Sequence, residues 1–173
     1  TEFYDRNGHL LYRLYEGRNR SLVKLEGLPP FLIQATISVE DKNFYQHAGI
    51  DLEAIIRALS HNIKNKNHNE GASTITQQLI KNTLLTPEKT YIRKIKEVIL
   101  SLWAERLYSK NDILQMYFNE VAYGGPNWGI QAASLSYFGK DPKDLNLAEA
   151  AFLAGLPTSP SQFSPYGTNP ELG

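Results

Sequence analysis

Apolar residues recur through most of this chain at the spacing of an α-helix, which restricts the folds open to it. The pattern is clear in residues 52–64, where apolar side chains return every three or four positions, at Leu52, Ile55, Ile56, Leu59 and Ile63. Strand-like and helix-like segments do not alternate, so a parallel sheet is not expected. We therefore predict a mainly α fold.

Capping residues and helix breakers divide the pattern into separate helices. Pro29-Pro30 opens a helix expected over 30–40, and Asp51 is the expected N-cap of 52–64. Further helices are expected after Ser73 or Thr74, after Ser109, over 129–138 and over 147–156. Asn146 with Glu149 predicts a capping box at the start of the last one.

The longest predicted helix runs from Thr86-Pro87 to about Tyr108. We expect its apolar stripe to be buried, namely Ile92, Ile95, Ile99, Leu102 and Leu107. Two short strands are expected within 2–15, because Asn7-Gly8 is a hairpin signal. The polar segment 64–70 and the tail rich in proline and serine should be irregular.

Bulk composition limits the function classes. The chain has 173 residues, enough for one domain, and a formal net charge of zero, which gives no argument for nucleic acid as a partner. It has no cysteine, which excludes disulfides and thiolate chemistry. No run approaches the length of a transmembrane helix. We expect residues 1–173 to be a single domain excised from a longer, membrane-anchored protein.

Two acids stand out in polar surroundings. Glu40 lies near the end of the predicted helix 30–40, between Val39 and Phe44, where partial desolvation would suit it to general base work. The alternative is a solvated acid at a helix end. Glu97 ends a basic run that contains Arg93 and Lys94, and a salt-bridged, solvated helix face explains that pattern equally well.

The segment between the acids is rich in hydroxyl and amide groups. Ser73, Thr74 and Gln78 could hydrogen-bond sugar hydroxyls or phosphate oxygens, although a capped helix with exposed polar positions has the same pattern. Lys81 and Lys89 extend the basic group, which could neutralise a pyrophosphate. The four histidines form no metal motif, and Ser73 lacks the GxSxG context of a serine hydrolase.

Five segments, in order, resemble motifs of the peptidoglycan glycosyltransferase domain, family 51 of the glycosyltransferases. This domain occurs in class A penicillin-binding proteins and monofunctional transglycosylases. The segments are EDKNFYQHAGID (40–51), GASTITQQLIKN (71–82), RKIKE (93–97), ILQMYFNEVAYG (113–124) and LAEAAFLAGLPTSPSQFSP (147–165). The resemblance implies a lysozyme-like helical domain with a short N-terminal β-hairpin. It also implies polymerisation of lipid II into β-1,4-linked glycan, with inversion and release of undecaprenyl pyrophosphate.

The resemblance assigns roles residue by residue. Glu40 matches the catalytic base and Glu97 the second glutamate of the family. The positions that match substrate-contacting residues are Ser73, Thr74, Gln78, Lys81, Lys89, Arg93, Lys94 and Asn119. Two departures stand out: Lys89 replaces a common arginine and so loses bidentate geometry toward phosphate, and Gln115 replaces a common glutamate.

The resemblance further implies the partners and the cellular location. These are lipid II, the growing glycan chain and the membrane surface, at the extracytoplasmic face of the bacterial cytoplasmic membrane, with a transpeptidase domain possible in the full-length protein. No cofactor is required, although a divalent cation, Mg²⁺ or Mn²⁺, could bind at the pyrophosphate with Glu97 as a ligand. Two alternatives stay open: a lysozyme-like or lytic enzyme that cleaves glycan, and a non-catalytic module that binds lipid II.

Overall fold

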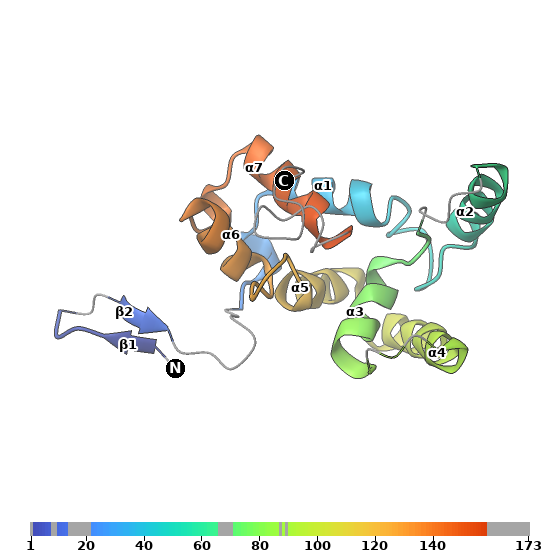
Figure 1. Cartoon of the computed structure of the whole chain (residues 1–173), viewed down its shortest axis with the longest axis horizontal. Helices are drawn as coiled ribbons and strands as arrows, with labels where there is room; N and C mark the ends of the chain where they lie inside the picture. The colour runs from blue at the N-terminus through green and yellow to red at the C-terminus, as the bar shows by residue number, and fades with distance from the viewer. Residues whose placement is uncertain are drawn as a thin grey trace.

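Helices build most of the chain in the computed structural model, which describes residues 2–7, 10–13, 22–65, 71–86, 88 and 90–158. Figure 1 shows their arrangement, with α5 in the middle of the helical part. The described helices are α1 (Pro30–Glu40), α2 (Leu52–Asn65), α3 (Ile75–Leu84), α4 (Tyr91–Leu107), α5 (Lys110–Glu120), α6 (Ile130–Phe138) and α7 (Leu147–Gly155). The prediction of a mainly α fold is confirmed.

Two short strands precede the helices. Strand β1 (Glu2–Tyr4) pairs antiparallel with β2 (Leu10–Arg13), and Phe3 faces Tyr12 in the register. Gly8, the second residue of the Asn-Gly signal, and His9 lie outside the described residues. The same holds for most of the predicted loop 64–70 and of the tail that follows Thr158.

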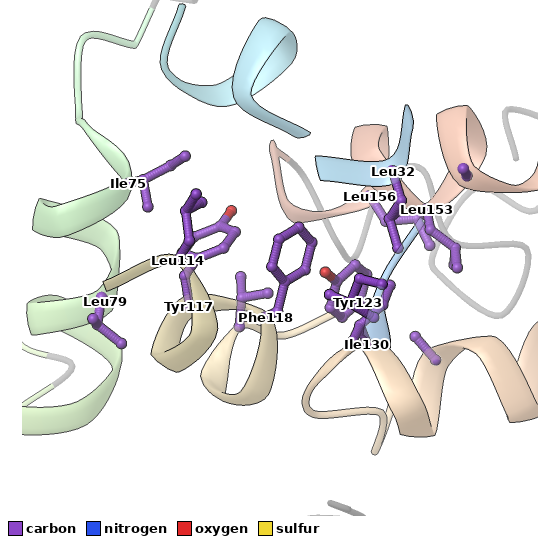
Figure 2. Packing of buried hydrophobic residues seen from close by; sticks show 14 of the residues in the cluster. Leu32, Ile75, Leu79, Leu114, Tyr117, Phe118, Tyr123, Ile130, Leu153 and Leu156 are labelled. Atoms are coloured by element: carbon purple, nitrogen blue, oxygen red, sulfur yellow. The ribbon is translucent and has the colours of Figure 1, made fainter. Parts of the chain in front are cut away.

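The hydrophobic core surrounds α5. Its side chains Ile113, Leu114, Tyr117 and Phe118 are all fully buried, and they follow helical spacing. Helix α1 packs against α7, and α3 packs against both α5 and α4. Figure 2 shows how side chains from α1, α3, α5 and α7 meet in this core. Each such aliphatic or aromatic side chain contributes about 1.5–3 kcal/mol by its burial.

Local capping signals are used as predicted. Ser109 with Asp112 and Asn146 with Glu149 form capping boxes at the starts of α5 and α7. Asp51 accepts a hydrogen bond from the Ala54 N–H and so caps α2. These interactions satisfy backbone donors that a helix start leaves unpaired.

Helix α4 contradicts the prediction in two ways. It begins at Tyr91 with Thr90 as its N-cap, because the Thr90 hydroxyl accepts from the Arg93 N–H, and not at Pro87. Its apolar stripe is not buried: the predicted stripe residues are 41% to 71% exposed, at Ile92, Ile95, Ile99, Leu102 and Leu107. The opposite face packs inward through the buried residues Glu97, Ser101 and Ala104.

Small residues on that inward face allow a close backbone approach. Gly49 has a positive φ of 91°, and a Cβ there would lie 2.9 Å from the Ser101 carbonyl oxygen. On α2, too, the residues that pack inward are small, Ala54 and Ala58, whereas Leu52 and Ile56 are exposed. The side chains of Leu59 and Ile63 lie outside the described part. Apolar residues therefore face outward along α4 and at Leu52 and Ile56 of α2, whereas Ile55 is half-buried.

Candidate active site

Glu40 lies where three segments far apart in sequence meet. It is the last residue of α1, and it is half-buried. Its Oε2 accepts a hydrogen bond from Gln78 Nε2 of α3 at 2.6 Å, and its Oε1 accepts from Thr158 Oγ1 at 2.9 Å. Thr158 ends the 3-10 helix Leu156–Thr158. The two donors are neutral, so they orient the carboxylate and leave its charge in place.

Glu40 also lines a polar pocket of about 410 Å³. Ser73 contributes to the wall from the segment before α3, Lys42 from the loop after α1, and Arg57 from α2. Sequence analysis did not identify Lys42 and Arg57, because both lie outside the basic run that contains Arg93 and Lys94. Only the fold brings them beside Glu40.

Asp41 anchors the loop that follows Glu40. Its buried carboxylate accepts from the Ile75 N–H, at the first residue of α3, at 2.9 Å. It also contacts His47 Nε2 at 2.9 and 3.0 Å. His47 Nδ1 accepts from the Gly49 N–H at 3.1 Å, so in the neutral ring the hydrogen is on Nε2, which donates to Asp41. Asp41 therefore joins this loop to α3.

Glu97 is buried among cations. Its side chain is 2% exposed, and it pairs with Arg93 Nη1 at 3.1 Å and with Lys94 Nζ. Lys94 Nζ also donates to Ser73 Oγ at 3.1 Å. Because Ser73 lines the pocket at Glu40 as well, the basic cluster and the first acid share one region of the molecule. The open alternative of a fully solvated, salt-bridged face does not describe Glu97.

Comparison with known proteins decides the family. A family model described as transglycosylase matches residues 7–172. The chain belongs to the transglycosylase family. This confirms the resemblance that the five ordered motifs predicted.

Several curated relatives of this transglycosylase chain are penicillin-binding proteins. It is 46% identical to penicillin-binding protein 1A of Rickettsia prowazekii (strain Madrid E) over 168 residues, 95% of this chain and 21% of the relative. It is 46% identical to penicillin-binding protein 1F of Bacillus subtilis (strain 168) over 165 residues, 95% of this chain and 23% of the relative. The chain thus spans about a fifth of the length of the relatives that it matches.

Two predicted substrate-contacting residues of the transglycosylase are used by the fold itself. The buried Thr74 hydroxyl donates to the Gly49 carbonyl at 2.7 Å and accepts from the Gln77 N–H at 3.2 Å, as the N-cap of α3. Asn119, also buried, bonds both the N–H and the carbonyl of Val23, at 2.8 and 2.9 Å. Both side chains hold backbone segments in place.

The structure describes one of the two remaining lysines of the predicted basic group. Lys81 is exposed in the last turn of α3, where its positive charge interacts favourably with the negative end of the helix dipole. Lys89 lies outside the described residues.

The Gln115 departure has a simple structural explanation. Gln115 Oε1 accepts from the Leu25 N–H at 3.0 Å, next to the Asn119–Val23 bonds. A glutamate oxygen would accept the same bond. The two side chains together fix the segment before α1 onto α5, so this position supports the backbone.

The donor set near Glu97 does not suit a metal ion. Each Glu97 oxygen already contacts a cationic side chain. Within the described ranges, no three histidine, cysteine, aspartate or glutamate side chains gather closely enough to hold a metal. A cation at Glu97 would have to displace Arg93 or Lys94.

Helices α2 and α4 both expose apolar side chains. In the part of the chain that the structure describes, no helix combines the length and the apolar character needed to cross a membrane.

Proposed function

We propose that this transglycosylase domain polymerises lipid II into β-1,4-linked glycan, with Glu40 as the general base. The observation that carries the proposal is the setting of Glu40: a half-buried carboxylate, oriented by Gln78 and Thr158, on the wall of a polar pocket. The cationic cluster at Glu97 reaches the same pocket through Ser73. A base and a group that stabilises an anionic leaving group are the two requirements of an inverting glycosyl transfer.

In the proposed reaction, Glu40 accepts the proton of the 4-hydroxyl group of the acceptor lipid II. That oxygen forms a bond to the anomeric carbon of the donor, the growing chain. The bond from this carbon to the lipid pyrophosphate breaks, and the pyrophosphate leaves with the electron pair. Attack and departure on opposite faces convert the α-linkage into a β-linkage, as in inverting glycosidases with a sugar hydroxyl in place of water.

The cationic side chains stabilise the departing pyrophosphate in this proposal. Arg93 and Lys94 are the candidates that pair with Glu97, and the predicted contributions of Lys81 and Lys89 stay predictions. One charge-assisted hydrogen bond contributes about 1.5–3 kcal/mol, or about one to two decades in rate. We assign Glu97 the task of holding Arg93 and Lys94 in place, because its two oxygens are engaged with them.

Thr74 and Asn119 act indirectly in this proposal. The Thr74 cap fixes the start of α3, which carries Gln78, and Asn119 fixes the segment that leads into α1, which ends at Glu40. Both support the frame of the site. We also propose that the two N-terminal strands form a hairpin, and that the helices have the lysozyme-like arrangement that the resemblance implies.

Membrane contact follows from the substrate's lipid tail. The apolar side chains that define one face of α4, Ile92, Ile95, Ile99 and Leu102, are exposed, as are Leu52 and Ile56 of α2. We propose that these faces rest on the extracytoplasmic surface of the cytoplasmic membrane. We also propose that the parent protein is anchored there and carries a transpeptidase domain. The relatives are named penicillin-binding proteins, and this chain spans only about a fifth of their length, which leaves room for a further domain.

The test is Glu40→Gln assayed with purified lipid II. We expect the wild type to release undecaprenyl pyrophosphate and to make longer glycan, and Glu40→Gln to lose nearly all of this activity. Glu53→Gln is the matched control, because Glu53 is an exposed acid at the start of α2. Full polymerisation by Glu40→Gln would refute the role of Glu40.

The same assay distinguishes the competing functions. Shortened glycan from a finished polymer, with no lipid substrate present, would show a lytic enzyme. Binding of lipid II without turnover would show a non-catalytic module. The pair of cations at the buried Glu97 favours synthesis, since cleavage of finished glycan leaves no pyrophosphate to neutralise.

A further inference from the structure

A polar network outside the proposed substrate-contacting residues runs behind Glu40, and Lys110 is at its centre. Lys110 is the first residue of α5. Its Nζ lies 2.8 Å from each Glu105 carboxylate oxygen and donates to the His47 carbonyl oxygen at 2.7 Å. It also lies 4.4 Å from the centre of the buried Phe44 ring, a cation–π contact. This one ammonium group therefore contacts two other segments, the end of α4 at Glu105 and the loop after α1 at Phe44 and His47.

Glu105 depends on this ammonium group. Its side chain is 5% exposed, and a carboxylate removed from water is costly without a cation. It also accepts from Thr76 Oγ1 of α3 at 2.5 Å. Gly49 packs against it, since a Cβ at Gly49 would meet Glu105 Cγ at 3.1 Å. The Lys110–Glu105 pair therefore joins α3, α4 and α5 to the loop 41–50.

That loop carries the link to Glu40. Lys110 holds the His47 carbonyl, and the His47 ring contacts Asp41. Asp41 in turn accepts from the N–H of Ile75, the first residue of α3. Gln78 lies one turn further along α3 and donates to Glu40. The placement of Gln78 against Glu40 thus depends on contacts that begin at Lys110.

We propose that Lys110 is a positioning residue for the Glu40–Gln78 pair, acting through His47 and Asp41. The proposal rests on the proposed function of Glu40 and adds a residue that touches neither sugar nor pyrophosphate. Misplacement of a reacting group by about 1 Å can cost about a hundredfold in rate. The loss should fall on kcat, because the described cation pair at Glu97 makes no hydrogen bond or ion pair with Lys110.

The experiment compares Lys110→Met, Lys110→Arg and the control Lys140→Met. Lys140 also pairs with one glutamate, Glu149 at 2.6 Å, but outside this network. Lipid II polymerisation gives kcat and KM, and amide hydrogen exchange of the substrate-free protein reports the Ile75 and Gly49 N–H groups. A structural role alone would not separate kcat from KM in this way.

We expect Lys110→Met to lower kcat by about 10- to 100-fold with KM within about twofold, and to speed exchange at Ile75 and Gly49. Lys110→Arg should recover part of both properties, because it keeps the charge and the donors. Lys140→Met should match the wild type in both measurements. Wild-type kcat in Lys110→Met, or a fall in kcat with unchanged exchange at Ile75, would overturn the proposal.

Failure of the variant to fold does not end the test. His47→Ala removes the link to Asp41 and leaves the Lys110–Glu105 pair in place, so it should show the same fall in kcat and the same faster exchange at Ile75. A normal His47→Ala protein would overturn the proposal. If the wild type does not polymerise lipid II, the proposed function fails, and the exchange measurements still decide whether Lys110 controls Ile75.

Discussion

Gln78 donates its side-chain N–H to Glu40 at 2.6 Å and so joins the end of α1 to α3. The donor is neutral, whereas Glu97 is held by the cations Arg93 and Lys94. The two acids therefore have different electrostatic settings. Glu40 keeps a carboxylate that is oriented and not neutralised, which suits a base, and Glu97 is committed to two positive charges.

The first prediction concerns the charge beside Glu40. Gln78→Glu would place two carboxyl groups in contact, and one of them must take a proton, because two like charges at that distance disfavour ionisation. We expect the acidic limb of the kcat/KM profile to move to higher pH. On that limb, activity at a fixed pH should fall about tenfold for each pH unit by which the limb moves. The measurement is lipid II polymerisation between pH 5 and 9.

Gln115→Glu is the matched control, since its oxygen accepts a backbone N–H from Leu25 and a carboxylate can do the same. We expect an unchanged profile for this variant. An unchanged profile for Gln78→Glu as well would contradict the hydrogen bond to Glu40 as a feature of the working enzyme.

The second prediction concerns Glu97. Glu97→Gln removes the negative charge between Arg93 and Lys94, so the two cations repel and lose their fixed positions. We expect kcat to fall by about 10- to 100-fold, the equivalent of one charge-assisted contact. The measurement is polymerisation at several Mg²⁺ and Mn²⁺ concentrations, with Glu53→Gln as the control. A loss that metal concentration reverses would show that Glu97 holds a metal ion instead.

Local signals in the sequence predicted much of the fold. The capping boxes at Ser109 and Asn146 and the cap at Asp51 depend on residues within three positions, so a pattern is enough to find them. The buried face of α4 could not be found in this way. Helical periodicity identifies an apolar face, but not what covers it, and here Glu97 and Ser101 pack inward while Ile95 faces out.

The candidate site, too, combines residues that short motifs identify with contacts that only the fold reveals. The family resemblance identified Glu40, Glu97 and the basic run, because each of them lies within a short motif. It did not show that Thr158, 118 residues from Glu40 in the chain, reaches the same carboxylate. The contact between Lys110 and the His47 carbonyl spans 63 residues and also needs the fold. Such bonds connect segments whose order in sequence carries no information about their distance.

The third prediction is a pH dependence of stability at Asp51. Burial pushes the pKa of this carboxyl upward, but hydrogen bonds from the Ala54 N–H and from Asn43 outweigh it, so the pKa of Asp51 lies below its usual 3.8. A lowered folded-state pKa means that the unfolded chain binds the proton more readily. The stabilisation is therefore complete above about pH 4 and is lost as the pH falls through the folded-state value.

Asp51→Asn isolates this effect, because an asparagine oxygen can still cap α2. We expect the wild type to be more stable than Asp51→Asn at pH 6, and this difference to disappear toward pH 2. Urea unfolding followed by circular dichroism gives the two free energies of unfolding. A difference that stays constant over that pH range would contradict the lowered pKa.

The last prediction concerns the exposed apolar face of α4. Ile95 and Ile99 lie one turn apart on this face, and both are exposed. Full burial of one such side chain contributes about 1.5–3 kcal/mol, or about a tenfold to hundredfold change in binding per residue. We therefore expect Ile95→Gln with Ile99→Gln to weaken binding to vesicles of phosphatidylglycerol and phosphatidylcholine by at least about a hundredfold if both side chains enter the bilayer fully.

Leu147→Gln, at an exposed leucine on α7, should leave vesicle binding unchanged. Polymerisation of a water-soluble, short-chain lipid II analogue should be normal in the double variant, since its polar pocket is intact. Equal vesicle binding by the double variant and the wild type would show that another surface meets the membrane.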